Sequence, residues 1–234
     1  MKKIFFVFFL VCNQLAAQNI AQLEDQIKKT AFNIVNAETY AERVTADSSF
    51  TRGLVRALKT PYSFNHKFDS LITVSTLFSP DSTFKIFTWQ LLAEDEKSYR
   101  QKGAIQMNTK DGSLQLIPLF DCSEFTDAPT DSVRDVKHWI GAIYYKIIPK
   151  KFNNKTYYTL LGLDGNNAVT HKKWMDVMYF DNDNKPEKVS IFDILLLLKG
   201  NSPKNPHILL IYFIKPAKSI SCLDLFIFKF LYIL

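Results

Sequence analysis

The side chains best suited to acid–base chemistry are aspartates in the second half of the chain. Two carboxylates that face each other across a cleft can protonate a leaving group and activate water, as in glycoside hydrolases. A histidine beside an aspartate offers a comparable pair. The candidates are Asp121, Asp135, Asp164 and Asp176, with His138 as the histidine. The sequence does not indicate which of them meet, so an extracytoplasmic hydrolase acting on glycan or peptide is one of two hypotheses.

Aromatic side chains offer a second, non-catalytic chemistry. Phe, Trp and Tyr make up 14% of the chain, and their rings can stack on sugars or peptides. The candidates for such a surface are Trp139, Tyr144, Tyr157 and Trp174. Adjacent residues of a strand point to opposite faces, so only one tyrosine of each Tyr-Tyr pair lines a given surface. The leading hypothesis is an exported, non-enzymatic binding or structural module.

Motifs that hold cofactors or metals are missing from the sequence. It contains no nucleophile elbow, no phosphate loop, no His-Glu-x-x-His and no Cys-x-x-Cys. Residues 181–184 (Asp-Asn-Asp-Asn) resemble the start of a calcium loop, but Lys185 stands where a third ligand belongs and no glutamate occupies the twelfth position. We therefore expect a polar turn there, no metal site, no cofactor and no assigned catalytic residue.

The first residues predict export. Lys2 and Lys3 precede an apolar run, residues 4–11, and small residues follow at Ala16 and Ala17. This is the pattern of a signal peptide spanning 1–17, cleaved after Ala17. The apolar run is shorter than the roughly 20 residues of a membrane span, so we expect no span in the mature chain. A lipid anchor at Cys12 fits less well, because the preceding residue is Val11 rather than a small one.

The charge of the chain bears on its partners. The net charge is +6, and the two leader lysines account for two of these charges, which leaves +4. A nucleic-acid-binding protein would show a stronger imbalance or a basic stripe. We expect a periplasmic or extracellular protein that does not bind nucleic acid, with a cell-envelope component as one possible partner.

Helical periodicity follows the leader, over residues 18–61. Apolar residues recur every three to four positions over 19–45, which predicts an amphipathic helix. A second, shorter helix is expected to be capped by Asp47 or Ser48 and to end at Pro61.

Residues 62–185 are predicted to form an antiparallel β domain. Hairpin turns are expected at Asp111-Gly112, Asn153-Asn154 and residues 164–167, and Pro118 indicates an edge strand or a strand end. The fold class is α+β: two N-terminal helices packed on a mainly antiparallel sheet, as a sandwich or an open barrel. The expected strands are 83–92, 99–107, 113–119, 141–148, 156–163 and 172–180.

The composition changes after about residue 185. Residues 186–234 are crowded with Ile, Leu, Phe and Lys, which A/T-rich codons encode, and they show neither helical periodicity nor alternation. This favours an aberrant tail produced by a shifted reading frame over a genuine hydrophobic segment. On this interpretation the native closing strands are missing.

Several stretches resemble uncharacterised exported proteins of Bacteroidetes-type bacteria. These stretches are residues 49–59, 68–71, 79–89, 139–148 and 157–164. The resemblance covers about residues 1–185 and implies further strands after Asp176–Phe180. The family has no assigned activity, so the resemblance implies no catalytic residue.

Overall fold

The computed structural model describes residues 2–95, 97–126, 134–165, 172–180 and 196–197. The fold is α+β, with two helices followed by two antiparallel sheets. The elements are α1 (Lys2–Asn36), α2 (Tyr40–Leu58), β1 (Val74–Phe78), β2 (Phe84–Leu92), β3 (Tyr99–Met107), β4 (Gln115–Leu119), β5 (Ile143–Phe152), β6 (Lys155–Asp164), β7 (Lys172–Tyr179) and β8 (Leu196–Leu197).

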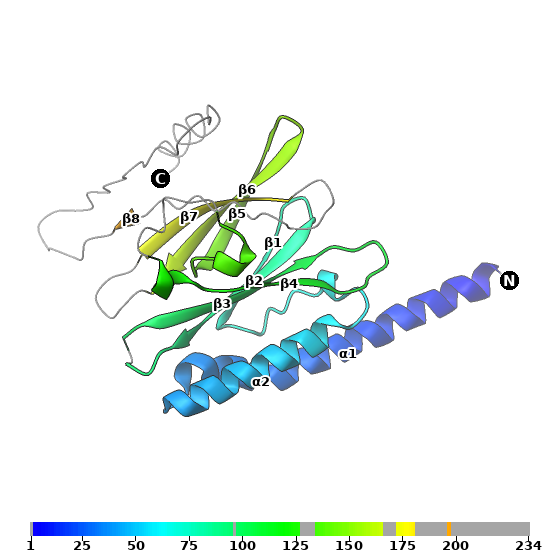
Figure 1. Ribbon diagram of the computed structural model, residues 1–234. Coiled ribbons are helices and arrows are strands. Elements are labelled where there is room, and N and C mark those ends of the chain that lie inside the picture. Colours follow the sequence, from blue (N-terminus) through cyan, green and yellow to red (C-terminus); the bar gives the residue numbers. More distant parts are fainter. Residues whose placement is uncertain (1, 96, 127–133, 166–171, 181–195, 198–234) are drawn as a thin grey trace, which may run out of the picture.

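The elements form three layers. The helices cover one face of the sheet β1-β2-β3-β4, and the sheet β5-β6-β7-β8 covers its other face (Figure 1). One core lies between the sheets, where Phe84, Ile86 and Ile105 meet Tyr158 and Leu160. A second core lies under the helices, where Ile27, Ile34, Phe50 and Leu54 meet Phe87 and Trp89. Strand β2 is therefore covered on both faces.

The predicted helix over 19–45 is interrupted. α1 ends at Asn36, and Thr39 starts α2 with a capping box: its hydroxyl accepts from the Glu42 amide, and the Glu42 carboxylate accepts from the Thr39 amide. The chain reverses here, so Ala41 and Val44 are exposed rather than continuing the apolar stripe that ends at Ile34.

The prediction that Asp47 or Ser48 caps the second helix is wrong for the same reason, because both lie inside α2. Asp47 instead accepts a hydrogen bond of 2.8 Å from the Trp89 indole and so ties α2 to β2. Arg43, also buried, donates to carbonyls of the α1–α2 turn, Ala37 and Glu38, and of the end of β2, Leu92 and Ala93.

The strand predictions are confirmed apart from their ends, and β1 and β8 were not foreseen. β1 pairs antiparallel with β2 and was missing from the prediction, because Val-Ser-Thr-Leu-Phe is short and mixed in polarity. Gly112 has a φ of +73° at the β3–β4 turn, and Asn153 and Asn154 have φ of 46° and 61° at the β5–β6 turn. Pro118 lies on β4, an edge strand, as predicted.

β8 pairs antiparallel with Lys172 and Lys173 of β7. The other residues of the predicted aberrant tail 186–234, the turn at 166–167 and the calcium-like residues 181–184 lie outside the described residues. The frameshift interpretation therefore stays a prediction.

Candidate functional site

Asp121 connects three segments of backbone. Its Oδ2 accepts from the Gln101 amide at 3.0 Å, and its Oδ1 accepts from the amides of Ser123 at 2.9 Å and Gly141 at 3.1 Å. A Cβ on Gly141 would lie 2.6 Å from Asp121 Oδ2, so the approach requires glycine. Three backbone amides therefore converge on one carboxylate. This geometry joins β3 to the chain segments before and after the 127–133 region.

Asp164 meets the same glutamine. The Gln101 side-chain amide donates to Asp164 Oδ1 at 2.7 Å, and both side chains are buried. The structure therefore brings Asp121 and Asp164 to opposite ends of one residue. The Gln101 side chain lies between the two carboxylates. In a glycosidase, the sugar and a water must fit between the paired carboxylates, so Asp121 and Asp164 do not form such a pair.

Asp176 lies in the interior between the sheets, with the aromatic candidates. The Tyr144 hydroxyl donates to Asp176 Oδ2, and the Trp139 indole donates to the Tyr144 hydroxyl at 2.8 Å. Trp139, Tyr144 and Asp176 are 0%, 1% and 1% exposed. The three side chains form a buried polar relay between β5, β7 and the segment before β5, closed to solvent.

Three of the four aromatic candidates thus belong to the core. Trp174 is also buried, opposite Gly162 on β6, so Trp139, Tyr144 and Trp174 do not present a stacking surface. Tyr157 is partly buried and lies 5.6 Å from the Tyr179 ring on β7. As the alternation rule requires, Tyr145 is exposed where Tyr144 is buried.

Asp135 and His138 do form the pair that the hydrolase hypothesis requires. His138 Nδ1 lies 2.6 Å from Asp135 Oδ1 on a short 3₁₀ turn, with side-chain exposures of 65% and 41% for the histidine and the aspartate. Burial raises the pKa of Asp135, but hydrogen bonds from His138 and the Lys137 amide outweigh it and lower the pKa. Cys122, a free cysteine, donates to the Lys137 carbonyl. The pair stands on an open surface.

A buried lysine that the sequence did not nominate has a strongly lowered pKa. Lys85 lies on β2, facing the helices, and is 0% exposed. Its Nζ donates to the carbonyls of Ser63, Phe64 and His66 at 2.9–3.1 Å. Burial lowers the pKa of Lys85 to about 7, whereas carbonyl acceptors favour the charged amine.

Four aromatic rings complete the surroundings of this amine. The rings of Phe64, Phe68, Phe78 and Phe87 lie 5.0–5.6 Å from Nζ, a distance at which ring faces attract a cation. Lys85 thereby holds the 63–66 turn against β2. The interaction is structural, because the amine is enclosed.

A second buried group holds the same segment from α1. Glu24 accepts from the Ser70 amide and hydroxyl at 2.8 and 2.6 Å, and its other oxygen lies 2.5 Å from His66 Nε2. Burial raises the pKa of Glu24, but the bonds from Ser70 and His66 lower it overall. His66 and Ser70 meet at Glu24, not at each other, so the order Ser-His-acid of a hydrolytic triad is not formed.

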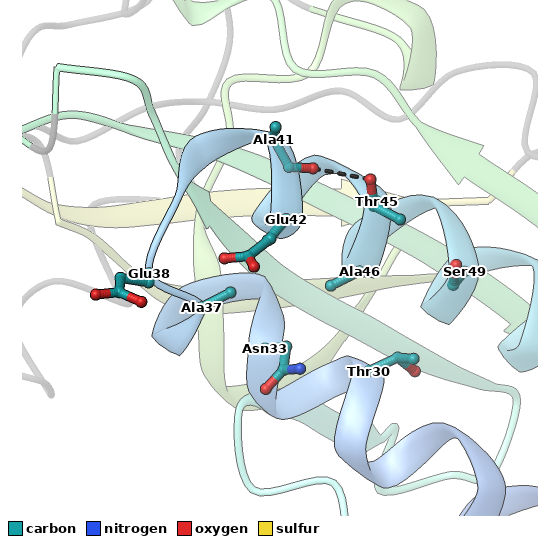
Figure 2. Close-up of a pocket in the computed structure, with 9 residues that line it drawn as sticks. All are labelled: Thr30, Asn33, Ala37, Glu38, Ala41, Glu42, Thr45, Ala46 and Ser49. Carbon is teal, nitrogen blue, oxygen red and sulfur yellow. Dashed lines mark hydrogen bonds between the residues drawn. The ribbon is translucent and has the colours of Figure 1, made fainter.

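A hollow lies where α1 turns into α2. Figure 2 shows polar and small side chains from both helices around it. Its volume is about 630 Å³. Among the lining residues, Glu42 belongs to the capping box, and the Thr45 hydroxyl donates to the Ala41 carbonyl. These polar atoms maintain the helix ends. The lining residues are Thr30, Asn33, Ala37, Glu38, Ala41, Glu42, Thr45, Ala46 and Ser49.

A smaller, mostly apolar hollow of about 360 Å³ lies beside α1. Phe32 and Ile72, 45% and 79% exposed, form its apolar part, and Lys28 and Lys29 stand at its rim with Asp25. None of the residues nominated from the sequence lines either hollow.

Comparisons with protein-family models, curated proteins and solved structures found no match to this chain. Among the described residues, no three His, Cys, Asp or Glu side chains gather in a way that would hold a metal ion. No helix in the described ranges is both long enough and apolar enough to cross a bilayer.

Proposed function

We propose that this chain is an exported, non-enzymatic protein that acts as a binding or structural module in the periplasm or at the cell surface. The main support for the proposal is that three of the carboxylates predicted as catalytic candidates accept hydrogen bonds from other parts of the fold. Asp121 holds backbone amides, Asp164 holds Gln101 and Asp176 holds Tyr144. Their hydrogen bonds build the fold, and a catalytic pair would need them available to a substrate.

The course of α1 supports the export part of the proposal. The first turns of this helix project beyond the sheets (Figure 1), and Ile20, Ile27 and Ile34, which follow the predicted cleavage site, are buried. Removal of residues 1–17 would therefore leave the packing of Ile20, Ile27 and Ile34 intact. The mature chain would then start at Gln18. We also propose that it belongs to the exported Bacteroidetes-type proteins that it resembles.

The test of export is fractionation followed by intact-mass measurement. The expected product lies outside the inner membrane and begins at Gln18. Full-length, unprocessed protein in the cytosol would overturn export, and a product beginning at an acylated Cys12 would replace the soluble form by a lipid-anchored one.

The alternative function is an extracytoplasmic hydrolase, and the Asp135–His138 pair is the observation that favours it. A panel of glycan and peptide substrates tests it. We expect no turnover above the rate of a His138→Asn variant. Turnover that is abolished by both Asp135→Asn and His138→Asn would establish the hydrolase and end the non-enzymatic proposal.

A further inference from the structure

The β5–β6–β7 sheet separates its charges by sign. Within the described parts of these strands and the β5–β6 turn, the acidic residues are Asp164 and Asp176, which are 8% and 1% exposed. The lysines of the same elements whose side chains are described lie at the surface: Lys146, Lys150, Lys151 and Lys173 are exposed and Lys155 is partly exposed. The described strands of this sheet therefore present lysines rather than carboxylates at the surface, although the chain as a whole carries only +6.

Three of these lysines lie at the tip of a projecting hairpin. The β5–β6 hairpin extends from the body on the side away from α1 and α2 (Figure 1). Its tip reads Lys150-Lys151-Phe152-Asn153-Asn154-Lys155. Phe152 is 39% exposed, and both asparagines adopt positive φ, which forms the tight turn that two-residue hairpins favour.

A large apolar side chain flanked by lysines suits one kind of surface. Lysine stems can lie along an apolar layer while their amines stay in water, and aromatic rings partition to the boundary between headgroups and acyl chains. Anionic headgroups attract lysines that lie within a Debye length. A convex tip of this kind enters a planar interface without a complementary cavity, which a folded protein partner would have to supply.

We propose that the tip of the β5–β6 hairpin, residues 150–155, docks the protein on anionic lipid bilayers. This inference rests on the proposed non-enzymatic, exported function and names the partner of that module. Lys146 and Lys173, further along the same sheet, add attraction at longer range. Phe152 supplies the apolar contact, and Lys150, Lys151 and Lys155 supply the charge.

The experiment is sedimentation of the purified protein with vesicles. Equimolar phosphatidylglycerol and phosphatidylcholine vesicles are compared with pure phosphatidylcholine vesicles, at 0.1 M and 0.5 M NaCl. We expect binding to the anionic vesicles only, with weakening at the higher salt because screening shortens the range of the attraction. Equal binding to both vesicle types, or to neither, would overturn the proposal.

Matched variants locate the contact. The triple variant Lys150→Gln, Lys151→Gln and Lys155→Gln is expected to weaken binding about a hundredfold, since each lysine lost weakens it about fivefold. The control removes the same charge elsewhere, as Lys28→Gln, Lys29→Gln and Lys110→Gln, and should keep binding within about threefold of wild type, because only long-range attraction changes. An equal loss in the control would show a net-charge effect and overturn the hairpin as the contact.

A second variant and its control test the apolar contact. Phe152→Ser is expected to weaken vesicle binding about tenfold, whereas Ile72→Ser, at the more exposed residue beside α1, should leave it unchanged. A soluble sulfated polysaccharide is the competing polyanion. The lipid proposal fails if the polysaccharide binds the wild type and Phe152→Ser equally and also displaces the protein from vesicles. The hairpin would then recognise polyanions in general. Fractionation tests export independently, since vesicle binding does not depend on where the cell places the protein.

Discussion

The buried Lys85 makes the stability of this protein depend on pH in an unusual direction. Its pKa falls from 10.5 to about 7 in the fold, so between these values the unfolded chain binds more protons than the folded one. Stability then rises with pH. Between pH 7 and pH 9 the gain is about 2 kcal/mol, at about 1.4 kcal/mol per pH unit once the folded amine is mostly neutral.

The assay is urea unfolding at intervals between pH 7 and pH 9, followed by fluorescence of the buried Trp89, Trp139 and Trp174. The upper limit keeps tyrosine ionisation out of the measurement, because burial raises the pKa of Tyr158 to about 12 and unfolded tyrosine titrates near 10. Lys85→Met should remove the slope, and Lys102→Met, which removes a half-exposed lysine near Asp47, should retain it.

A flat wild-type profile would refute this reasoning. It would mean that the carbonyls of Ser63, Phe64 and His66 and the surrounding rings keep the amine charged up to pH 9. A slope that persists in Lys85→Met would assign the pH dependence to another group. Either result would end the account of Lys85 as a group that titrates near neutral pH.

Three further predictions concern the helix side of the molecule. Glu24 has a lowered pKa, so its carboxylate stabilises the fold above pH 4.5, and this contribution is lost as the pH falls through the pKa of the folded state. Glu24→Gln should therefore cost about 1–2 kcal/mol of unfolding free energy at pH 7 and make stability less dependent on pH in acid. Arg43→Met should cost roughly 3 kcal/mol in urea unfolding, because it leaves backbone carbonyls at Leu92 and the α1–α2 turn without their donor, and Arg43→Lys should restore only part. Gly53→Ala should lower the thermal midpoint at a cost of about 1–3 kcal/mol, since its Cβ would lie 2.2 Å from Ile27 Cγ2, and the cost should shrink in an Ile27→Ala background.

Much of the fold was predictable because local patterns and tertiary structure agree. The strand predicted over 99–107 and the Asn153-Asn154 turn are each a β structure that the fold then uses. The helix break was missed although its signal is in the sequence: Thr39 followed by Glu42 is a capping box, and the apolar period carried the predicted helix through it.

The site was less predictable, because sequence does not show which face of a strand is covered. Trp139, Tyr144 and Trp174 were candidates for a surface and are core residues, since a second sheet lies across them. Lys85 was overlooked as an ordinary strand lysine. Its flanking residues on β2, Phe84, Ile86 and Phe87, are apolar on both faces, and a lysine within such a strand has to be enclosed.

The order of strands within the sheets has a consequence for how the polypeptide reaches its native state. Both sheets are meanders, in which each strand pairs with the next one along the chain. Each pairing closes only the loop between two consecutive strands, and proteins that close short loops fold faster than those that must first close long ones. Each sheet can form as a succession of hairpins, so we expect the two sheets to dock late in folding. Docking then forms the hydrogen bonds of Tyr144 with Thr88 and Ser75 of the other sheet.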